Sequence, residues 1–336
     1  MSRVLISIII PNHNKGFIID RTLNTIFTSP ENNDIEVVVV DDGSTDNSLE
    51  IIKSFPCKLI ALSKNSGASR ARNIGARNSK GEFLFFIDSD CLLEADTLLH
   101  VRRAIAKYGH DMVIIGGTYT KEPYDKSFFS TFQSIFVSYS ELKNTEPDYI
   151  ATHAMVINHR DFEKIGGFRE DFMPILEDVE FSHRAKRMGY KLIMDPLIRV
   201  QHFFNFNLFK SLRNAFRKAS YWIFYSLQEG DIFADSGTAS RELKFNGLVL
   251  FMNMILFIFF LYNKEAIFLF LLILFLGINL WVNRRLIISF YEKGLYFTIR
   301  AVLYYISLYS FAAVVGSLWG TMMYIIHSSK NRVSRK

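Results

Sequence analysis

The sequence predicts an α/β domain with a Rossmann-like mixed sheet, followed by a C-terminal helical membrane domain. Its 336 residues are 49% hydrophobic, enough for one sizeable domain and a further part. Up to about Arg241 the chain mixes charged and apolar residues as soluble proteins do, whereas from Leu248 onward it consists of long apolar runs. Within the first part, short β-branched runs alternate with a stretch of helical spacing, which is the pattern of an α/β fold.

The expected strands are residues 5–10, 35–40 and 83–87, continuous apolar runs that each end in polar or turn residues. Residues 18–27, between the first two runs, have helical spacing, so the segment predicts a βαβ unit and a parallel sheet. In an open α/β sheet, ligands bind beyond the carboxyl ends of the strands. The polar segments 11–14, 41–46 and 88–90 are therefore expected to converge on one crevice.

The second part of the chain begins with a stretch that is both apolar and basic. Between residues 208 and 227 apolar side chains recur at helical spacing, while Lys210, Arg213 and Arg217 take another face. This pattern is typical of an amphipathic helix on a membrane surface, and a helix packed on its own domain is the alternative. The formal net charge of +6 comes with no nucleic-acid-binding motif. Its basic residues gather near the apolar segments, which favours anionic lipid headgroups as partners over nucleic acid.

Three strongly apolar stretches follow, at residues 248–262, 266–282 and 301–326. A membrane-spanning helix needs about 20 mostly apolar residues, so the third stretch is long enough alone, and the first two suit a hairpin. If the α/β domain and Arg284–Arg285 are cytoplasmic, three spans place the basic tail outside, against the positive-inside tendency. Either the third stretch reverses near Gly316 and Gly320, or that tendency is overruled here.

The expected divisions of the chain follow from these segments. They are residues 1–205 for the α/β domain, 206–245 for an amphipathic interfacial helix and linker, 246–328 for two to four transmembrane helices, and 329–336 for a basic tail.

Two acidic motifs stand at the ends of expected strands. VVVVDDGSTDNS places Asp41 and Asp42 before a Gly-Ser turn, where carboxylates can accept hydrogen bonds from a base edge or ribose hydroxyls; a helix N-cap with an ordinary turn is the alternative. FLFFIDSDCLLE places Asp88 and Asp90 one residue apart, a spacing that lets hard oxygen ligands face a divalent cation bridging a diphosphate. Two solvated turn aspartates would produce the same pattern.

Two further segments carry candidate functional groups. In KNSGASRARNIGARNSKGEF, Gly67 allows close backbone approach, and Arg70 and Arg72 are placed to reach phosphates or a ribose, unless this is simply an exposed basic helix. In ILEDVEFSHRAKRMGY, Glu177 and Asp178 precede a helix. A carboxylate there can act as general base toward a hydroxyl acceptor, although acids also suit a helix N-terminus for electrostatic reasons alone.

In their order and spacing these segments resemble one family. SIIIPNHN, VVVVDDGSTD, NSGASRARNIGARNSKGEFLFFIDSD, THAMVINHRDFEKIGGFRED and LEDVEFSHRAKRMGY together look like the family 2 glycosyltransferases of the GT-A fold, and the resemblance spans roughly residues 3–205. It implies a nucleotide-sugar-binding domain, a bound divalent metal (Mn²⁺ or Mg²⁺), and inversion of the anomeric centre by a single displacement.

The resemblance also implies roles for individual residues. The nucleotide sugar would be bound by Pro11, Asn12, Asn14, Asp41, Asp42, Gly67, Arg70, Asp88 and Ser89. The metal would be held by Asp90 and His202, Asp178 would be the base with Glu177 in support, and Arg213 and Arg217 would reach the leaving diphosphate. Cys91 stands where relatives often have another acid, which leaves the details of the metal geometry open. The absence of a QxxRW segment after the acidic cluster favours one transfer per encounter over a processive polymerase.

The expected function is transfer of a sugar from a UDP- or GDP-sugar to a membrane-associated acceptor in cell-envelope glycan synthesis. The acceptor would be a polyprenyl-linked saccharide, a polyprenyl phosphate or a glycolipid, and the enzyme would be a multi-pass protein of the inner (plasma) membrane with its catalytic domain in the cytoplasm. Nucleotidyl transfer and a non-catalytic membrane scaffold are the alternatives. The first would release pyrophosphate, and the second has no reason to keep five acids in the crevice.

Overall fold

The computed structural model describes residues 5–109, 111–171, 175–231 and 235–333, with side chains described up to residue 329. The chain divides into two compact units, the first made of Met1–Lys126 and Glu141–Phe204 and the second of Ser127–Ser140 and Asn205–Lys336. The side chains of the expected basic tail from residue 330 onward lie outside the described residues.

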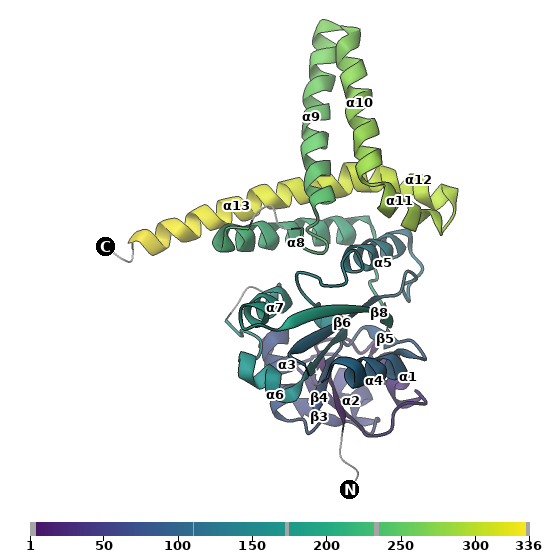
Figure 1. Cartoon of the computed structure of the whole chain (residues 1–336), viewed down its shortest axis with the longest axis vertical. Helices are drawn as coiled ribbons and strands as arrows, with labels where there is room; N and C mark the ends of the chain where they lie inside the picture. The colour runs from purple at the N-terminus through teal and green to yellow at the C-terminus, as the bar shows by residue number, and fades with distance from the viewer. Residues whose placement is uncertain (1–4, 110, 172–174, 232–234, 334–336) are drawn as a thin grey trace. The chain divides into compact units, whose positions relative to one another are not determined.

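The first unit is an α/β domain built on an eight-stranded sheet (Figure 1). Its strands are β1 (Ile6–Asn12), β2 (Ile35–Asp41), β3 (Lys58–Ala61), β4 (Phe83–Phe86), β5 (Cys91–Leu93), β6 (Val113–Tyr119), β7 (Met155–Asn158) and β8 (Lys191–His202). Its helices are α1 (Ile19–Phe27), α2 (Ser48–Lys53), α3 (Ala68–Arg77), α4 (Thr97–Tyr108), the short η1 (Thr152–Ala154), α6 (His159–Ile165) and α7 (Glu177–Arg187).

The sheet is mixed, with the order β3-β2-β1-β4-β7-β6-β8-β5. The strands β2, β1 and β4 are neighbours and parallel, as the sequence predicts, and their register pairs Asn12 with Asp41 and Ile9 with Phe86. Their carboxyl ends therefore lie at one edge of the sheet. In the other half, β7 is antiparallel to β4 and to β6, β8 is parallel to β6, and β5 is antiparallel to β8.

One face of the sheet is covered by α3, α6 and α7, whose apolar residues pack on Ile9, Val38 and Val40 in a single buried cluster. The contact between α3 and the sheet depends on Gly75, because a Cβ there would lie 2.5 Å from Cγ2 of Ile9. This close approach brings the first turns of α3 to the edge where the parallel strands end.

The second unit is helical. It contains α5 (Phe128–Glu141), whose last residue belongs to the first unit, α8 (Leu208–Glu229), α9 (Arg241–Asn263), α10 (Ala266–Val282), α11 (Arg284–Tyr291), α12 (Leu295–Tyr304), the π-helical turn η2 (Tyr305–Tyr309) and α13 (Ser310–Val333). Aromatic side chains of α5, α11, α12 and η2 form its core, with Phe132, Phe290 and Tyr304 among them. Buried amides join the base of the α9–α10 hairpin, where Asn279 and Asn283 both donate to Oδ1 of Asn246 at 3.0 and 2.7 Å.

Among the described residues, two continuous helices are long and apolar enough to span a membrane, Arg241–Asn263 and Leu295–Ser329. A third span is formed if Ala266–Val282 and Arg284–Tyr291, which meet at a 66° bend, count as one. The alternative in which the third apolar stretch reverses near its glycines is wrong, because α13 runs without interruption through them. Gly316 and Gly320 instead lie against α8, where added Cβ atoms would come within 2.3 Å of the Phe216 carbonyl oxygen and 2.1 Å of that of Ser220.

Candidate active site

Asn12 and Asp41 lie buried side by side at the carboxyl ends of β1 and β2. The Asn12 side chain donates to Oδ2 of Asp41 at 2.7 Å. The same carboxylate accepts the amide N–H of Ser44 at 2.9 Å and the Ser44 hydroxyl at 2.6 Å. Asn14, in a left-handed conformation with φ 53, accepts the Thr45 amide N–H at 2.8 Å. Asp41 therefore holds the shape of the turn that follows β2, and Asn14 fastens that turn to the end of β1.

Asp42 fastens the loop that enters α3. Its two carboxylate oxygens accept the backbone N–H groups of Ser66 at 2.7 Å and Gly67 at 2.8 Å. Gly67 has φ 93, a conformation that disfavours a side chain, and a Cβ built there meets no atom within 4 Å. The glycine is thus required by the backbone conformation, and open space remains beside it.

Arg72 lies beneath this edge and joins two of the expected site acids. Its guanidinium donates to Oδ1 of Asp88 and to Oε1 of Glu177, each at 2.7 Å, and its side chain is only 5% exposed. Burial opposes the charge on Arg72, but the two carboxylates raise its pKa above the usual value. Burial also opposes ionisation of Asp88, yet the charge of Arg72, assisted by His153 and His202, lowers the pKa of Asp88. Arg72 and Asp88 are therefore both charged at neutral pH.

The expected catalytic acids Glu177 and Asp178 open α7. The residue before them, Leu176, has φ 74, a conformation uncommon for any residue except glycine and often found at functional sites. Asp178 Oδ1 accepts the amide N–H of Val179 at 2.9 Å. The positive end of the helix dipole favours the ionised carboxylate here, which is the form that accepts a proton.

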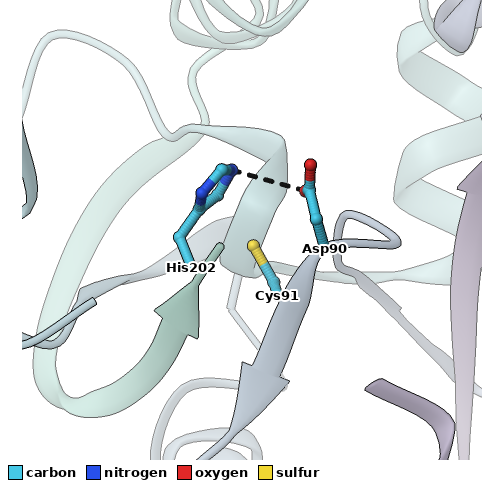
Figure 2. Close-up of side chains that lie close together, drawn as sticks. All are labelled: Asp90, Cys91 and His202. Atoms are coloured by element: carbon cyan, nitrogen blue, oxygen red, sulfur yellow. Dashed lines mark ion pairs between the residues drawn. The ribbon is translucent and has the colours of Figure 1, made fainter. Parts of the chain in front are cut away.

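Asp90, Cys91 and His202 form a cluster in which one potential ligand atom from each lies within 4.8 Å of the others (Figure 2). Asp90 Oδ1 lies 3.3 Å from Nε2 of His202, and Asp90 Oδ2 accepts a hydrogen bond from the Lys15 ammonium at 2.6 Å. The sheet produces this cluster, because the antiparallel pairing of β5 with β8 sets Cys91 opposite His202.

The donor chemistry of this cluster fits a divalent cation. Burial lowers the pKa of His202, although Asp90 and Asp88 act in the opposite direction, so the imidazole is neutral and able to ligate a metal. Its Nδ1 is buried with no hydrogen-bond partner among the described residues. Burial raises the pKa of the Cys91 thiol, and the carboxylate of Asp90 is the hard oxygen ligand that Mn²⁺ and Mg²⁺ prefer.

An aromatic wall stands beside the cluster. The ring of His153 stacks on Tyr119 at 3.9 Å between centroids, and the ring of His202 stacks on Phe204 at 4.0 Å. His153 is buried, and its Nε2 lies 3.5 Å from Oε2 of Glu141, which also accepts the Thr118 hydroxyl at 2.7 Å.

The structure brings most of the expected site residues of the first unit to this edge. These residues lie on the strand ends, in the loops after the strands or at the start of α7, and they are Pro11, Asn12, Asn14, Asp41, Asp42, Gly67, Asp88, Asp90, Glu177, Asp178 and His202. Arg70 is placed elsewhere, on the exposed side of α3 with Nε 3.9 Å from Glu170. Ser89 is buried, and its carbonyl oxygen accepts the Thr22 hydroxyl at 3.0 Å. Arg213 and Arg217 belong to the second unit, so their contact with the diphosphate stays a prediction.

Sequence reasoning missed two charged or polar groups at this edge and misjudged a third. The sequence did not single out Lys15, which contacts Asp90, or His153, which lies next to Glu141. Arg72 was expected to reach phosphates or a ribose, but in the structure it bridges Asp88 and Glu177. The position of Lys15 directly after the PNHN segment is a signal that was available, because the end of β1 had to lie beside the end of β4.

Fold and site together define a GT-A-like α/β domain. Residues 7–166 match the family model described as Glycosyl transferase family 2. The chain thus carries a family 2 glycosyltransferase domain, which confirms the resemblance seen in its motifs.

Individual relatives agree with this family. The chain is 35% identical over 209 residues to glycosyltransferase GlyA of Streptococcus pneumoniae, which covers 56% of this chain and 29% of that protein. It is 31% identical over 204 residues to an uncharacterized glycosyltransferase of Haemophilus influenzae, covering 57% of this chain and 63% of that one. The chain therefore spans less than two thirds of the length of each of these relatives.

Among solved structures, the mannosyltransferase PcManGT from Pyrobaculum calidifontis, in complex with GDP-Man and Mn²⁺, is similar with a TM-score of 0.56 at 18% identity. The match covers 95% of this chain and 88% of that one. At this identity the similarity establishes the fold.

Proposed function

We propose that the protein is an inverting glycosyltransferase that transfers a sugar from a nucleotide-sugar donor to a membrane-associated acceptor. The observation that carries this proposal is the Arg72 bridge, which links Asp88 at the end of β4 to Glu177 at the start of α7. It couples the edge where a nucleotide would bind to the two acids that would act on an acceptor. The family 2 domain gives the same reaction class.

On the donor side, Asp42 and the loop of Gly67 would border the nucleoside, and Arg72 of the helix that follows this loop holds Asp88. Asp90 and His202 would hold the divalent cation that accompanies the diphosphate. The similar mannosyltransferase, which holds GDP-Man and Mn²⁺, supports this donor and metal class. When bound, such a cation neutralises the charge that develops on the departing nucleoside diphosphate. The protein's own contribution is to keep Asp90 and a neutral His202 adjacent through the register of β5 and β8.

On the acceptor side, we assign proton transfer to Asp178. Arg72 holds Glu177, which therefore positions the start of α7 and contacts acceptor or donor hydroxyls. The Asp178 carboxylate takes the proton from the acceptor hydroxyl as the oxygen attacks the anomeric carbon. The bond to the nucleoside diphosphate breaks in the same displacement, so the configuration at the anomeric carbon inverts.

The second unit supports a membrane-bound acceptor. Two of its helices are long and apolar enough to cross a bilayer, and an enzyme held at a membrane meets lipid-linked acceptors at a raised effective concentration. A polyprenyl-linked saccharide, a polyprenyl phosphate or a glycolipid in cell-envelope synthesis fits this setting, with the catalytic domain on the cytoplasmic side of the inner (plasma) membrane.

We further propose that the α9–α10 hairpin crosses the membrane and that α8 and α13 lie along its surface. Each basic residue of α8 would cost about 2.5–3.5 kcal/mol at the centre of a bilayer, and Lys210, Arg213 and Arg217 are all exposed on this helix. Because Gly316 and Gly320 pack α13 directly on α8, α13 is expected to share its position. The residues before α9 and the tail after α13 would then lie on one side, in agreement with the positive-inside tendency.

The proposal is tested by screening the purified, detergent-solubilised chain against UDP-, GDP- and dTDP-sugars with Mn²⁺ or Mg²⁺. Released nucleoside diphosphate is measured with and without a membrane lipid extract. Release that rises with the extract is the expected result and would identify the acceptor as lipid-borne. Release of pyrophosphate would indicate nucleotidyl transfer, and no release from any donor would return the chain to the class of non-catalytic scaffolds.

A further inference from the structure

A groove of about 450 Å³ opens between α8, α9 and α13, within the second unit. This volume lies in the range of roughly 300–1,000 Å³ that is typical of sites for small ligands. The residues that line it include Ala219 and Trp222 of α8, Lys244 and Leu248 of α9, and Ser317 and Leu318 of α13.

The walls of the groove are fixed by close helix packing. The carbonyl oxygen of Ser220 on α8 would lie 2.1 Å from a Cβ at Gly320, and a Cβ at Gly247 of α9 would lie 2.7 Å from Val314 of α13. Small residues at helix contacts permit such approach. The backbone of α13 therefore lies directly against that of α8, the Val314 side chain of α13 lies directly against the backbone of α9, and the space between these contacts stays open.

The groove is continuous with the apolar exposed surface of the helices. Leu248 is 59% exposed and Leu318 is 68% exposed, and both line the groove. On α13 the exposed apolar residues recur at helical spacing on one face: Phe311, Val315, Leu318, Trp319, Met322 and Ile325. A lipid that covers this face reaches the groove without crossing a polar barrier.

Two ammonium groups distinguish this groove from a plain lipid-facing crevice. Lys218 of α8 and Lys244 of α9 both line it, and none of the described residues that line it is acidic. An apolar channel with two cations complements a molecule that has a hydrocarbon chain and an anionic head. Each lysine near an anionic headgroup raises the affinity of the protein for that lipid by about fivefold.

We propose that this groove binds one anionic phospholipid of the surrounding bilayer, with an acyl chain along the apolar lining and the phosphate near Lys218 and Lys244. A bilayer phospholipid is the occupant because, in the membrane arrangement proposed above, the exposed apolar face beside the groove contacts bilayer lipids, which are then the lipids at the highest concentration there. The bound lipid joins α8 to α9 and α13, and it is distinct from the acceptor and donor of the transfer reaction.

Trp222 provides a direct readout, since it is buried and lines the groove, whereas the other two tryptophans of the chain, Trp281 and Trp319, are exposed. In the full chain with Trp281→Phe and Trp319→Phe, brominated phosphatidylglycerol is titrated into the detergent-solubilised protein and compared with brominated phosphatidylcholine. We expect saturable quenching of Trp222 at about 25-fold lower phosphatidylglycerol than phosphatidylcholine, which is about fivefold for each of the two lysines.

Variants separate the groove from general attraction to the micelle surface. Lys218→Met combined with Lys244→Met should remove the preference for phosphatidylglycerol, and Ala219→Phe should abolish saturable quenching by filling the groove. Lys210→Met, on α8 but outside the lining, is the matched control and should keep both properties. Inorganic phosphate is expected not to compete.

Equal quenching by the two lipids would overturn the proposal, as would a preference that survives loss of both lysines. Quenching that farnesyl phosphate relieves and unlabelled phosphatidylglycerol does not would also overturn it, because the groove would then belong to an isoprenoid. None of these quenching measurements depends on sugar transfer. A negative result for lipid binding can therefore be distinguished from an absence of the proposed enzyme activity.

Discussion

Replacing Arg72 with methionine should destabilise the first unit and disable its site. The change keeps most of the side-chain volume but removes the guanidinium that contacts Asp88 and Glu177 at 2.7 Å each. Loss of one partner of a buried ion pair typically costs about 3–5 kcal/mol, because the remaining charge stays buried without compensation. The Asp88 side chain is 31% exposed and that of Glu177 is 14% exposed, so water can relieve part of this cost. We therefore expect a loss of about 3 kcal/mol, at the lower end of that range.

The assay is amide hydrogen exchange of the full chain, read on peptides that cover β4 and α7. Exchange measures the opening free energy of each segment, which suits a chain of two units better than one global midpoint. Arg70→Met is the matched control on the same helix, because Arg70 is exposed and its Nε lies 3.9 Å from Glu170. It should change stability by no more than about 0.5 kcal/mol. Equal protection in the Arg72→Met variant and the native chain, or equal losses in both variants, would refute the role of the bridge.

The pH dependence gives an independent check. The folded-state pKa of Asp88 lies below its ordinary value, against the effect of burial, because of Arg72. The stabilisation from this charge is therefore fully present above the unfolded-state pKa of about 3.9 and is lost as the pH falls through the folded-state pKa. The stability difference between the native chain and Arg72→Met should thus be constant from about pH 5 to 7 and should narrow below about pH 4. A difference that widens on acidification would contradict the assignment.

Three further outcomes are expected. Asp178→Asn should keep affinity for the nucleoside diphosphate and lose turnover by about 100-fold or more, measured as product release; near-normal turnover would place the base elsewhere. Lys15→Met should strengthen Mn²⁺ binding by about two- to fivefold in titration calorimetry, since a partly exposed ion pair contributes about 0.2–1 kcal/mol and this ammonium competes for Asp90. Lys15→Arg should bind Mn²⁺ as the native chain does, and equal affinity in all three proteins would exclude competition. In a background without Cys57, single cysteines at Lys264 and Ser329 should react with an impermeant maleimide from opposite sides of the membrane, and labelling from one side would contradict the hairpin topology.

The parallel half of the fold could be predicted from the sequence because each of its strands is a continuous apolar run that ends in a polar cluster. Burial on both faces forces such runs, as in β1 and β2, where the central residues are all buried. The same logic placed Asp41, Asp42, Asp88 and Asp90 at one edge without any knowledge of the side-chain contacts.

The partners of these acids could not be predicted, because they depend on long-range register and on helix approach. His202 meets Asp90 through the pairing of β5 with β8, in which the paired residues are more than a hundred positions apart in the sequence. Arg72 bonds to the site acids from the side of α3 that also carries Gly75, three residues further on and packed on Ile9 of β1, whereas Arg70 lies on the exposed side of the helix. Helical spacing alone does not show which of two arginines on one helix faces inward.

In the second unit, the length and apolarity of α13 suggested a span, and the role of its glycines was misjudged. In isolation Gly316 and Gly320 look like points of reversal. Their function becomes visible only when the α8 backbone lies against them. Packing between helices, unlike hydrophobicity, leaves a weak signal in the sequence.

The proposed function requires that the sheet edge at the ends of β1, β2 and β4 binds a nucleoside diphosphate together with a metal held by Asp90. Titration calorimetry of UDP and GDP, with and without Mn²⁺, on the native chain and on Asp90→Ala tests it most directly. We expect Mn²⁺ to tighten binding of one of the nucleotides by tenfold or more in the native chain, on the order of one charge-assisted contact, and we expect Asp90→Ala to lose this effect. Metal-dependent affinity that is unchanged in Asp90→Ala would contradict the assignment of Asp90 as metal ligand.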